Sequence, residues 1–308
     1  MSLLIIGTVA FDEIETPFAN SGKIIGGSGT YAALSAARFT DGIDIVSIIG
    51  EDFGDDNLKL LAERGIGTSG VEQVAGEKTF FWRGRYHNDM NSRDTLETQL
   101  NVLAQFDPEV PQELRNARFL MLGNLTPAVQ MKVLKQMNKR PELVIMDTMN
   151  FWMDSAWDEL LEVIAEVDVL TINDEEARQL SGEYALPMAA KKIFTMGPKY
   201  LIIKKGEHGA LLFHQDKIFY APALPLEKVF DPTGAGDTFA GGFIGHLAHS
   251  QEINFENMKR AVIYGSAMAS FCVEEFGPER LLNLDRKAIH ERVMQFIDLT
   301  QFEMQLDS

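Results

Sequence analysis

The sequence predicts an α/β fold in which a mainly parallel sheet is wrapped by helices. Short apolar runs that are typical of buried strands alternate with segments of helical periodicity along nearly the whole chain. Parallel strands need long crossover connections, usually helices, and this alternation supplies them. By length, 308 residues make one large domain or two ordinary ones. Since no linker or repeat divides the pattern, we expect residues 1–308 to form a single domain.

The composition excludes several classes of partner. The formal net charge is −17, so the chain would repel nucleic acid and anionic membrane surfaces, and we expect neither as a partner. Cys272 is the single cysteine and excludes an intrachain disulfide, which fits a reduced, cytoplasmic setting. The first residues are strand-like, without a signal-peptide pattern, and no apolar stretch is long enough to span a bilayer.

The first elements predict a ligand-facing edge. An apolar strand-like run at residues 3–9 is followed closely by Asp12. Ligands of open α/β sheets bind beyond the carboxyl ends of strands, so Asp12 is placed to hold substrate hydroxyls; the alternative is a loop carboxylate in solvent. Gly26 and Gly27 then form a turn before a helix of small residues, which allows close approach to a ligand or tight packing. A strand and a helix follow within residues 43–64.

A segment of different character comes next. It is first aromatic and β-prone, then polar and turn-rich. We expect residues 77–102, together with residues 13–24, to form a small sheet that projects as a lid. A cluster of hydrogen-bond donors there suggests contacts to an acidic or phosphorylated acceptor; its members are Arg83, Arg85, His87, Asn88 and Arg93. A solvated polar hairpin is the alternative.

Two strands in the middle of the chain end in polar residues. Residues 119–122 lead to Asn124, and residues 143–146 lead to Asp147 and Asn150, with a helix between the two strands. The carboxyl ends of parallel strands form a ligand-facing rim. We therefore expect these three polar side chains to contact the acceptor.

Two further strands lead into candidate phosphate-binding segments. Residues 167–172 run into Asn173 and Glu176, which have the spacing of a helix cap and its capping-box partner. The strand at residues 200–204 runs into a basic, glycine-containing loop. Its candidate nucleotide contacts are Lys204, Lys205, Gly206 and Gly209.

Residues 229–243 are the most informative stretch and read V-F-D-P-T-G-A-G-D-T-F-A-G-G-F. An apolar run ends before proline, and helical spacing begins after Thr233, so we expect a strand, a tight turn capped by Thr233 and a helix. The first amides of a helix lack intrahelical partners, and the helix dipole adds positive potential there. Such amides form an anion hole suited to a phosphoryl group. They would come from Gly234, Ala235 and Gly236.

Asp237 lies one residue beyond these amides, in the first turn of the helix. A carboxylate there can orient a hydroxyl and take its proton while the amides stabilise charge on the moving phosphoryl group. The alternative is that Asp237 only complements the helix dipole and that the glycines only allow close packing. Farther on, we expect a long helix at residues 255–273 and an amphipathic helix from about residue 285 to 303.

The string at residues 231–243 closely resembles the C-terminal signature of the ribokinase-like (PfkB) family of sugar and nucleoside kinases. The resemblance implies that family's three-layer fold, with a small β lid that shields the acceptor and often forms a dimer contact. It also implies that residues 234–236 are the anion hole and that Asp237 is the catalytic base. The segments around Asp12 and around Gly26 and Gly27 resemble the family's elements that hold the acceptor.

The same resemblance implies ATP and Mg²⁺ as cofactors. Asn173 and Glu176 match the family's Asn-x-x-Glu motif, so Glu176 would hold Mg²⁺ through water. The segment after Lys204 resembles the one that touches the nucleotide phosphates. Asp231 and Thr233 match positions that can hold a monovalent cation, and many relatives need K⁺.

These observations favour an ATP-dependent kinase that phosphorylates a hydroxyl of a small sugar or sugar-like acceptor. A nucleoside kinase is the nearest alternative, and a non-catalytic sensor with the same fold is another. Family members often carry asparagine where this chain has Thr30 and Tyr31, so the acceptor pocket departs from the ribose pattern. Neither a dinucleotide fingerprint after the first strand nor a Walker A motif is present in the sequence.

Overall fold

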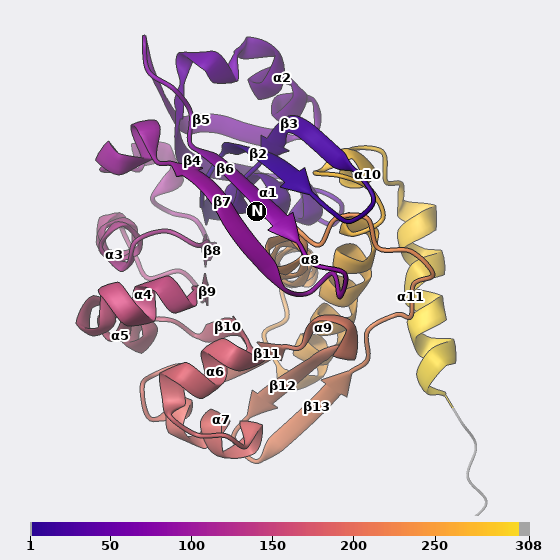
Figure 1. The fold of residues 1–308 in the computed structure, drawn as a ribbon. Coiled ribbons are helices and arrows are strands. Elements are labelled where there is room, and N and C mark those ends of the chain that lie inside the picture. Colours follow the sequence, from indigo (N-terminus) through magenta and orange to yellow (C-terminus); the bar gives the residue numbers. More distant parts are fainter. Residues whose placement is uncertain (1, 302–308) are drawn as a thin grey trace, which may run out of the picture.

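The structure, a computed structural model, describes residues 2–301 and contains a nine-stranded sheet and a four-stranded sheet (Figure 1). The strand order of the large sheet is β13-β12-β11-β10-β9-β8-β1-β4-β5. The strands from β11 to β5 are parallel, and β12 and β13 add antiparallel strands at one edge. The strands are β1 Leu3–Ile6, β4 Ile43–Gly50, β5 Ile66–Val74, β8 Phe119–Leu122, β9 Leu143–Asp147, β10 Val169–Asn173, β11 Tyr200–Lys204, β12 Ala210–His214 and β13 Lys217–Ala221.

Both faces of the inner strands of the large sheet are buried, because successive strand residues point into two different cores. Leu3 and Ile5 of β1 belong to one core, and Leu4 and Ile6 belong to the other. Helices α1, α2, α8, α9, α10 and α11 contribute to the first core and α3 to α7 to the second, so the predicted three-layer α/β fold is confirmed. The helices are α1 Ser28–Ala36, α2 Asp55–Glu63, α3 Pro127–Gln136, α4 Asn150–Ser155, α5 Trp157–Glu166, α6 Asp174–Ser181, α7 Leu186–Phe194, α8 Ala235–Ser250, α9 Phe255–Cys272, α10 Glu279–Leu282 and α11 Arg286–Thr300.

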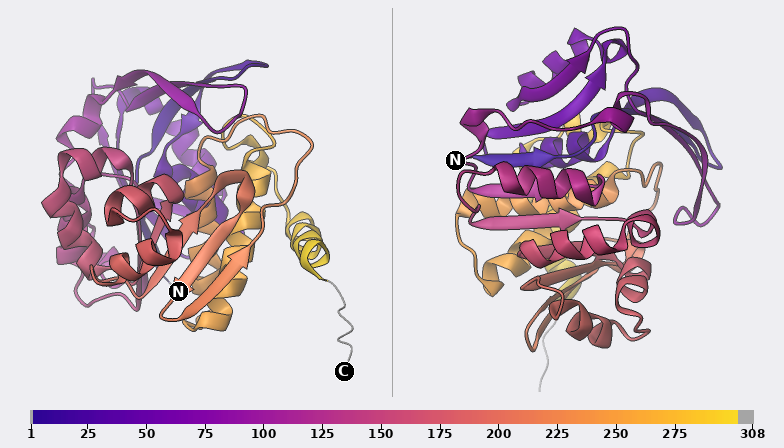
Figure 2. Two further views of the ribbon diagram at one scale, coloured as in Figure 1. Left: turned by 60° about the horizontal axis from the view of Figure 1, so that its bottom comes forward. Right: turned by 90° about the vertical axis from the view of Figure 1, so that its left-hand side faces the viewer.

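The four-stranded sheet, which we call the lid sheet, has the order β3-β2-β6-β7. It stands out from the main body on the side toward which the parallel strands point (Figure 2). Strands β2 and β6 pair in parallel, and the other two pairs are antiparallel. Strands β6 and β7 lie within the expected residues 77–102, whereas β2 begins before and β3 ends after the expected residues 13–24. The strands of the lid sheet are β2 Ala10–Glu15, β3 Asn20–Gly26, β6 Phe81–Tyr86 and β7 Arg93–Gln99.

The turn before α8 differs from the expected strand and cap. Residues 222–234 form no strand, because the three prolines in this segment, at 222, 225 and 232, cannot donate to a ladder. The strand that precedes the turn is β13, which ends at Ala221. Gly234, and not Thr233, is the N-cap of α8, with φ of 73°. A left-handed backbone at that point suits glycine, and a Cβ there would overlap the ring of Tyr31.

The C-terminal helix was expected to reach residue 303. In the structure α11 ends at Thr300, and residues 302 and 303 lie outside the described part of the chain. Within residues 2–301, no helix combines the length and the apolar character needed to cross a lipid bilayer.

Candidate active site

Three parallel strands bring polar side chains together at their carboxyl ends. β9 ends in Asp147, β10 in Asn173 and β11 in Lys204. The Lys204 ammonium lies 2.9 Å from Asp147 Oδ2 and 3.1 Å from Oδ1. Burial lowers the pKa of Lys204, but the charges of Asp147 and Glu176 outweigh burial and raise it. Lys204 is therefore a fixed positive charge at the end of the sheet.

The N-terminus of α8 lies beside this ammonium. A Cβ placed on Gly236 would be 3.1 Å from Lys204 Nζ, so the backbone there approaches the charge closely. The Ala235 amide donates to Pro232 O at 3.2 Å and closes the turn. Within residues 2–301 the amides of Gly234 and Gly236 have no hydrogen-bond acceptor. Two of the three amides expected from the sequence are thus free to bind an anion, and Lys204 adds charge to them.

Asp237 is partly buried in the first turn of α8. The pKa of Asp237 is raised to about 7: burial and the charge of Asp147 raise it, and Lys204 and Arg93 lower it. A carboxyl group with a pKa near neutrality can accept a proton in one step and release it in the next. This carboxyl also lies next to the free amides, as expected of a general base in phosphoryl transfer.

Glu176 completes the group of acids around Lys204. Its carboxylate accepts the Asn173 amide at 2.7 Å, and the Asn173 side chain accepts the Glu176 amide at 2.8 Å, which confirms the expected capping box. The pKa of Glu176 is raised to about 7: burial and the charge of Asp147 raise it, and Lys204 lowers it. Three carboxyl groups, Asp147, Glu176 and Asp237, therefore share one buried ammonium.

Asp12, on strand β2 of the lid sheet, is close enough to Asp231 and Asp237 for their charges to act on it. We call the region between the lid sheet and the carboxyl ends of the parallel strands the cleft. Its carboxylate packs so closely over Gly26 that a Cβ there would overlap it. Gly27, with φ of 96°, directs its amide to Asp12. The pKa of Asp12 is raised to about 7: burial and the charges of Asp231 and Asp237 raise it, and the hydrogen bond from the Gly27 amide lowers it. The Gly26–Gly27 turn therefore helps to fix the position of the Asp12 carboxylate.

Asp231 ties the anion-hole turn to the loop after α9. Its Oδ1 accepts the Thr233 amide at 2.9 Å, and its Oδ2 accepts the Gly277 amide at 3.0 Å. Burial raises the pKa of this carboxyl group, and the two amides oppose that rise. Both carboxylate oxygens fix the backbone on the two sides of the turn.

Three polar residues expected to contact the acceptor make other interactions. Asp147 pairs with Lys204 on the phosphate side. Asn124 accepts from Trp152 Nε1 at 2.8 Å, and its amide group contacts the sulfur of Met149. Asn150 donates to Gln179 of α6. Asn124 and Asn150 therefore hold α4 in place against its neighbours.

The two lid arginines expected to contact the acceptor form ion pairs within the lid sheet. Arg83 lies 3.4 Å from Glu97, and Arg85 lies 2.6 Å from Glu15. Side chains alternate along a strand, so residues 83 and 85 of β6 share one face, and Trp82, Gly84 and Tyr86 share the other. Asp12 is the register partner of Trp82, and it faces the cleft. The two arginines consequently lie on the face turned away from it.

The cleft face of the lid carries Trp82 and Tyr86, which the sequence analysis did not assign, and Arg93, which belongs to the expected donor cluster. Trp82 lies beside Asp12, and its ring covers Gly84, where a Cβ would overlap it. Tyr86 is 3% exposed and accepts a hydrogen bond from Thr233 Oγ1 at 3.1 Å. Arg93 is the cross-strand partner of Tyr86. The alternation of β6 could have indicated this face, but only a register with β2 and β7 shows which face meets the cleft.

The loop after β11 is closed by its own backbone. The Lys205 amide donates to Gly209 O at 2.8 Å, and Gly206 and Gly209 have φ of 53° and 86°. A Cβ on Gly206 would be 3.2 Å from Asn91 Oδ1, so this loop touches the tip of the lid hairpin. The loop therefore lies next to the tip of the lid hairpin, and its contact with the nucleotide phosphates stays a prediction.

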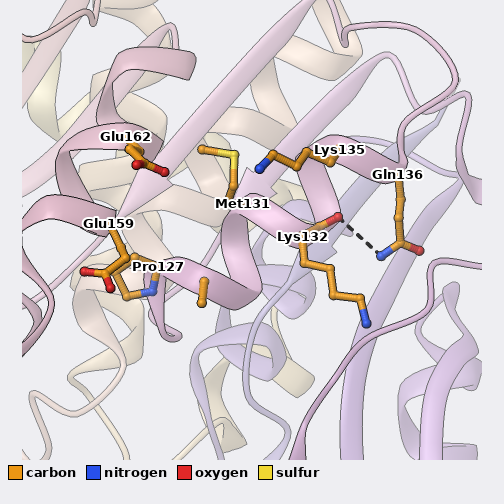
Figure 3. A pocket seen from close by; sticks show the side chains of 8 residues that line it. Pro127, Met131, Lys132, Lys135, Gln136, Glu159 and Glu162 are labelled. Atoms are coloured by element: carbon orange, nitrogen blue, oxygen red, sulfur yellow. Dashed lines mark hydrogen bonds between the residues drawn. The ribbon is translucent and has the colours of Figure 1, made fainter.

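The structure also has a groove away from this constellation. It has a volume of about 420 Å³ and lies between α3 and α5 (Figure 3). Lysines of α3 line one side and glutamates of α5 the other. None of the residues described above lines it. Its lining residues are Pro127, Ala128, Met131, Lys132, Lys135, Gln136, Glu159 and Glu162.

Comparison with known proteins identifies the family. The chain matches the model of the pfkB family of carbohydrate kinases over residues 7–283. It is 30% identical to a cytidine kinase of Thermococcus kodakarensis over 257 residues, which cover 82% of this chain and 91% of that protein. It is 26% identical to a nucleoside kinase of Methanothermobacter thermautotrophicus over 294 residues, which cover 90% of this chain and 91% of that protein.

Solved structures share the fold. A nucleoside kinase of Methanocaldococcus jannaschii superimposes with a TM-score of 0.77 at 22% identity, covering 96% of this chain and 99% of that one. The ribokinase of Arabidopsis thaliana, complexed with ribose and ATP, superimposes with a TM-score of 0.73 at 22% identity, covering 95% and 98%. The chain belongs to the pfkB family of carbohydrate kinases and is an ATP-dependent phosphotransferase whose acceptor is a hydroxyl of a small sugar or a nucleoside.

Proposed function

We propose that this chain phosphorylates a nucleoside, and that residues 1–308 act as one catalytic domain with the lid sheet over the acceptor. The observation that carries this choice is Trp82. Its ring is partly buried on the cleft face, beside the Asp12 carboxylate. Carboxylates bind sugar hydroxyls, and an indole ring offers a stacking surface for a nucleobase. A free sugar would leave that surface uncovered.

Asp237 acts as the general base in this proposal. It takes the proton of the acceptor hydroxyl as the hydroxyl oxygen forms a bond to the γ-phosphorus of ATP. The bond from that phosphorus to the β–γ bridging oxygen breaks, and ADP leaves with the electron pair. The amides of Gly234 and Gly236 and the ammonium of Lys204 stabilise charge on the moving group.

The acids around Lys204 fit a magnesium ion held mainly by water and phosphate. Within residues 2–301, no three histidine, cysteine or acidic side chains converge as a metal cage. Magnesium often keeps several waters and takes few protein oxygens, and Asp147 and Glu176 are placed to bind such waters. When bound, Mg²⁺ neutralises phosphate charge and orients the γ-phosphoryl group. A structural neighbour from E. coli is in complex with ATP and Mg²⁺, which supports this assignment.

Three further expectations belong to the proposal. The turn at Asp231 and Thr233 holds a monovalent cation, for which activation by K⁺ over Na⁺ is the test. The exposed apolar side chains of Phe18 and Leu100, beside the lid strands, support a homodimer contact through the lid, for which the molar mass in solution is the test. A single, buried cysteine, Cys272, supports a cytoplasmic location.

The acceptor is tested by a coupled assay of ADP release with nucleosides, pentoses, hexoses, sugar acids and sugar phosphates. We expect a nucleoside to have the highest kcat/KM. Trp82→Leu should raise the KM for that nucleoside about 10- to 100-fold, because stacking contributes about 1–3 kcal/mol per base. Trp157→Leu, which changes an exposed tryptophan on α5, is the matched control and should leave the KM unchanged.

A preference for a free sugar, unaffected by Trp82→Leu, would contradict the nucleoside assignment. If no acceptor in the panel consumed ATP while nucleosides still bound, a non-catalytic sensor would be the better description.

A further inference from the structure

We infer that the hairpin of β6 and β7 is a phosphate clamp: Tyr86 locks it onto the anion-hole turn, and Arg93 supplies a second positive charge to the γ-phosphoryl group. This inference rests on the proposed kinase function and extends it to two residues outside the family signature. It gives the lid a role in phosphoryl transfer in addition to covering the acceptor.

The lock is a contact between the lid and the turn before α8. Thr233 Oγ1 donates to the Tyr86 hydroxyl at 3.1 Å, and Tyr86 is 3% exposed. Thr233 is one residue before Gly234, whose amide is free for an anion. The backbone amide of Thr233 also donates a hydrogen bond to Asp231 Oδ1. A shift of the hairpin would therefore displace Thr233, the residue next to the anion hole.

The tip of the hairpin is closed by side-chain hydrogen bonds and reaches the loop after β11. Asp89 Oδ1 accepts the amides of Asn91 and Ser92 at 3.0 and 2.9 Å, and Asp89 Oδ2 accepts the Ser92 hydroxyl at 2.7 Å. Asn91 lies against Gly206 in the loop after β11. The hairpin thus bridges from the anion-hole turn to the loop after β11.

Register places Arg93 on the cleft face. Tyr86 and Arg93 are directly opposite each other on β6 and β7, and opposite residues of an antiparallel pair share a face. The Arg93 guanidinium lies 5.7 Å from the ring centre of Trp82, on the same face. Arg93 therefore lies between the stacking surface proposed for the base and the Tyr86 lock.

Arg93 is exposed and has no salt-bridge partner among residues 2–301, unlike Arg83 and Arg85 on the outer face. Its side chain forms a hydrogen bond with Tyr86, which opposes the rise that burial causes in the pKa of that tyrosine. Its charge nevertheless acts on the site, because it lowers the pKa of both Asp237 and Glu176. The three acids Asp147, Glu176 and Asp237 outnumber Lys204, and a triphosphate brings further negative charge. A guanidinium without a salt bridge offers the fork of N–H donors that matches phosphate oxygens.

The clamp is tested by calorimetric binding of two probes in the presence of Mg²⁺, the non-hydrolysable analogue AMP-PNP and ADP. We expect Arg93→Gln to weaken AMP-PNP about 10- to 100-fold relative to ADP, because only the analogue carries a γ-phosphoryl group. Arg93→Lys should recover part of the loss. Lys23→Gln, which removes a lid charge that pairs with Asp52 at 3.4 Å, is the matched control and should keep the wild-type ratio.

The lock is tested by Tyr86→Phe, which keeps the ring and removes the hydrogen bond. We expect faster amide hydrogen exchange in residues 86–93, a smaller AMP-PNP preference and a kcat lowered about 5- to 10-fold, with the KM for the acceptor little changed. Thermal unfolding of each variant reports whether the fold is intact.

An unchanged ratio of the two affinities in folded Arg93→Gln would overturn the clamp. Wild-type hydrogen exchange and wild-type kcat in Tyr86→Phe would overturn the lock. The binding measurements need no acceptor, so they decide the inference even if the nucleoside assignment fails.

Discussion

The Lys204 ammonium lies 2.9 Å from Asp147 Oδ2, and the two side chains are only 17% and 7% exposed. Asp147 ends β9 and Lys204 ends β11, so this ion pair crosses the end of β10. It holds the ammonium beside Gly236, at the start of α8. A pair that would otherwise serve stability thereby presents positive charge where phosphate is expected to bind.

Lys204→Met should lower the free energy of unfolding by about 3–5 kcal/mol, because it leaves Asp147 buried without its partner. The double variant that also carries Asp147→Asn removes the unpaired buried carboxylate and should recover most of that stability. Urea unfolding monitored by circular dichroism measures both effects. Both variants should lack phosphoryl transfer, since the positive charge of Lys204 is absent in both. An active double variant would contradict the role of Lys204.

Gly234→Ala tests the anion-hole turn. The φ of 73° and the Tyr31 ring against this residue both oppose a side chain. We expect a loss of stability of about 1–3 kcal/mol and weaker binding of Mg·ADP and Mg·AMP-PNP. Gly182→Ala offers a matched control, because Gly182 has a φ of 72° and open space around it. Equal loss of nucleotide binding in both variants would mean that the turn has no special role.

The pH dependence of catalysis follows from Asp237. Its pKa is raised to about 7, and a general base acts only when it is deprotonated. We expect kcat/KM to fall about tenfold per pH unit below about pH 7 and to level off above it. The measurement is a pH profile with the best acceptor. A flat profile between pH 5 and pH 8 would contradict this assignment.

Asp237 should also make the free energy of unfolding depend on pH. Activity should rise with pH, whereas stability should fall. The pKa rises from 3.8 in an ordinary setting to about 7 in the folded protein, so the folded state binds more protons between these values. Stability is therefore lost as pH rises from about 4 to about 7. Asp237→Asn should be more stable than wild type at pH 8, by about 1–3 kcal/mol, and this gain should vanish near pH 4. A gain that did not change with pH would show that the carboxyl group is not the cause.

Much of the fold could be predicted from the sequence because the parallel strands are continuous apolar runs. The strand at Phe119–Leu122 and the helix at Phe255–Cys272 match their expected positions closely. The capping box of Asn173 and Glu176 was also predicted, since it depends on local spacing alone. The segment before α8 was not, because its apolar Val229 and Phe230 suggested a strand where prolines prevent one.

The site could be predicted only where its chemistry is local. The turn and Asp237 lie within four consecutive residues. The position of Lys204 beside Gly236 depends on the order of strands in the sheet, which the sequence does not state. The lid arginines show the same limit: Arg83 and Arg93 are equally basic in the sequence, and only strand register separates the outer face from the cleft face.

The central claim is that Asp237 takes a proton from an acceptor hydroxyl next to the amides of Gly234 and Gly236. The most direct measurement is the rate at which wild type and Asp237→Asn form the phosphorylated nucleoside from Mg·ATP, followed by mass spectrometry. We expect Asp237→Asn to bind Mg·AMP-PNP and nucleoside while its kcat falls about 10²- to 10⁴-fold. A folded Asp237→Asn protein that forms product at the wild-type rate would contradict the account.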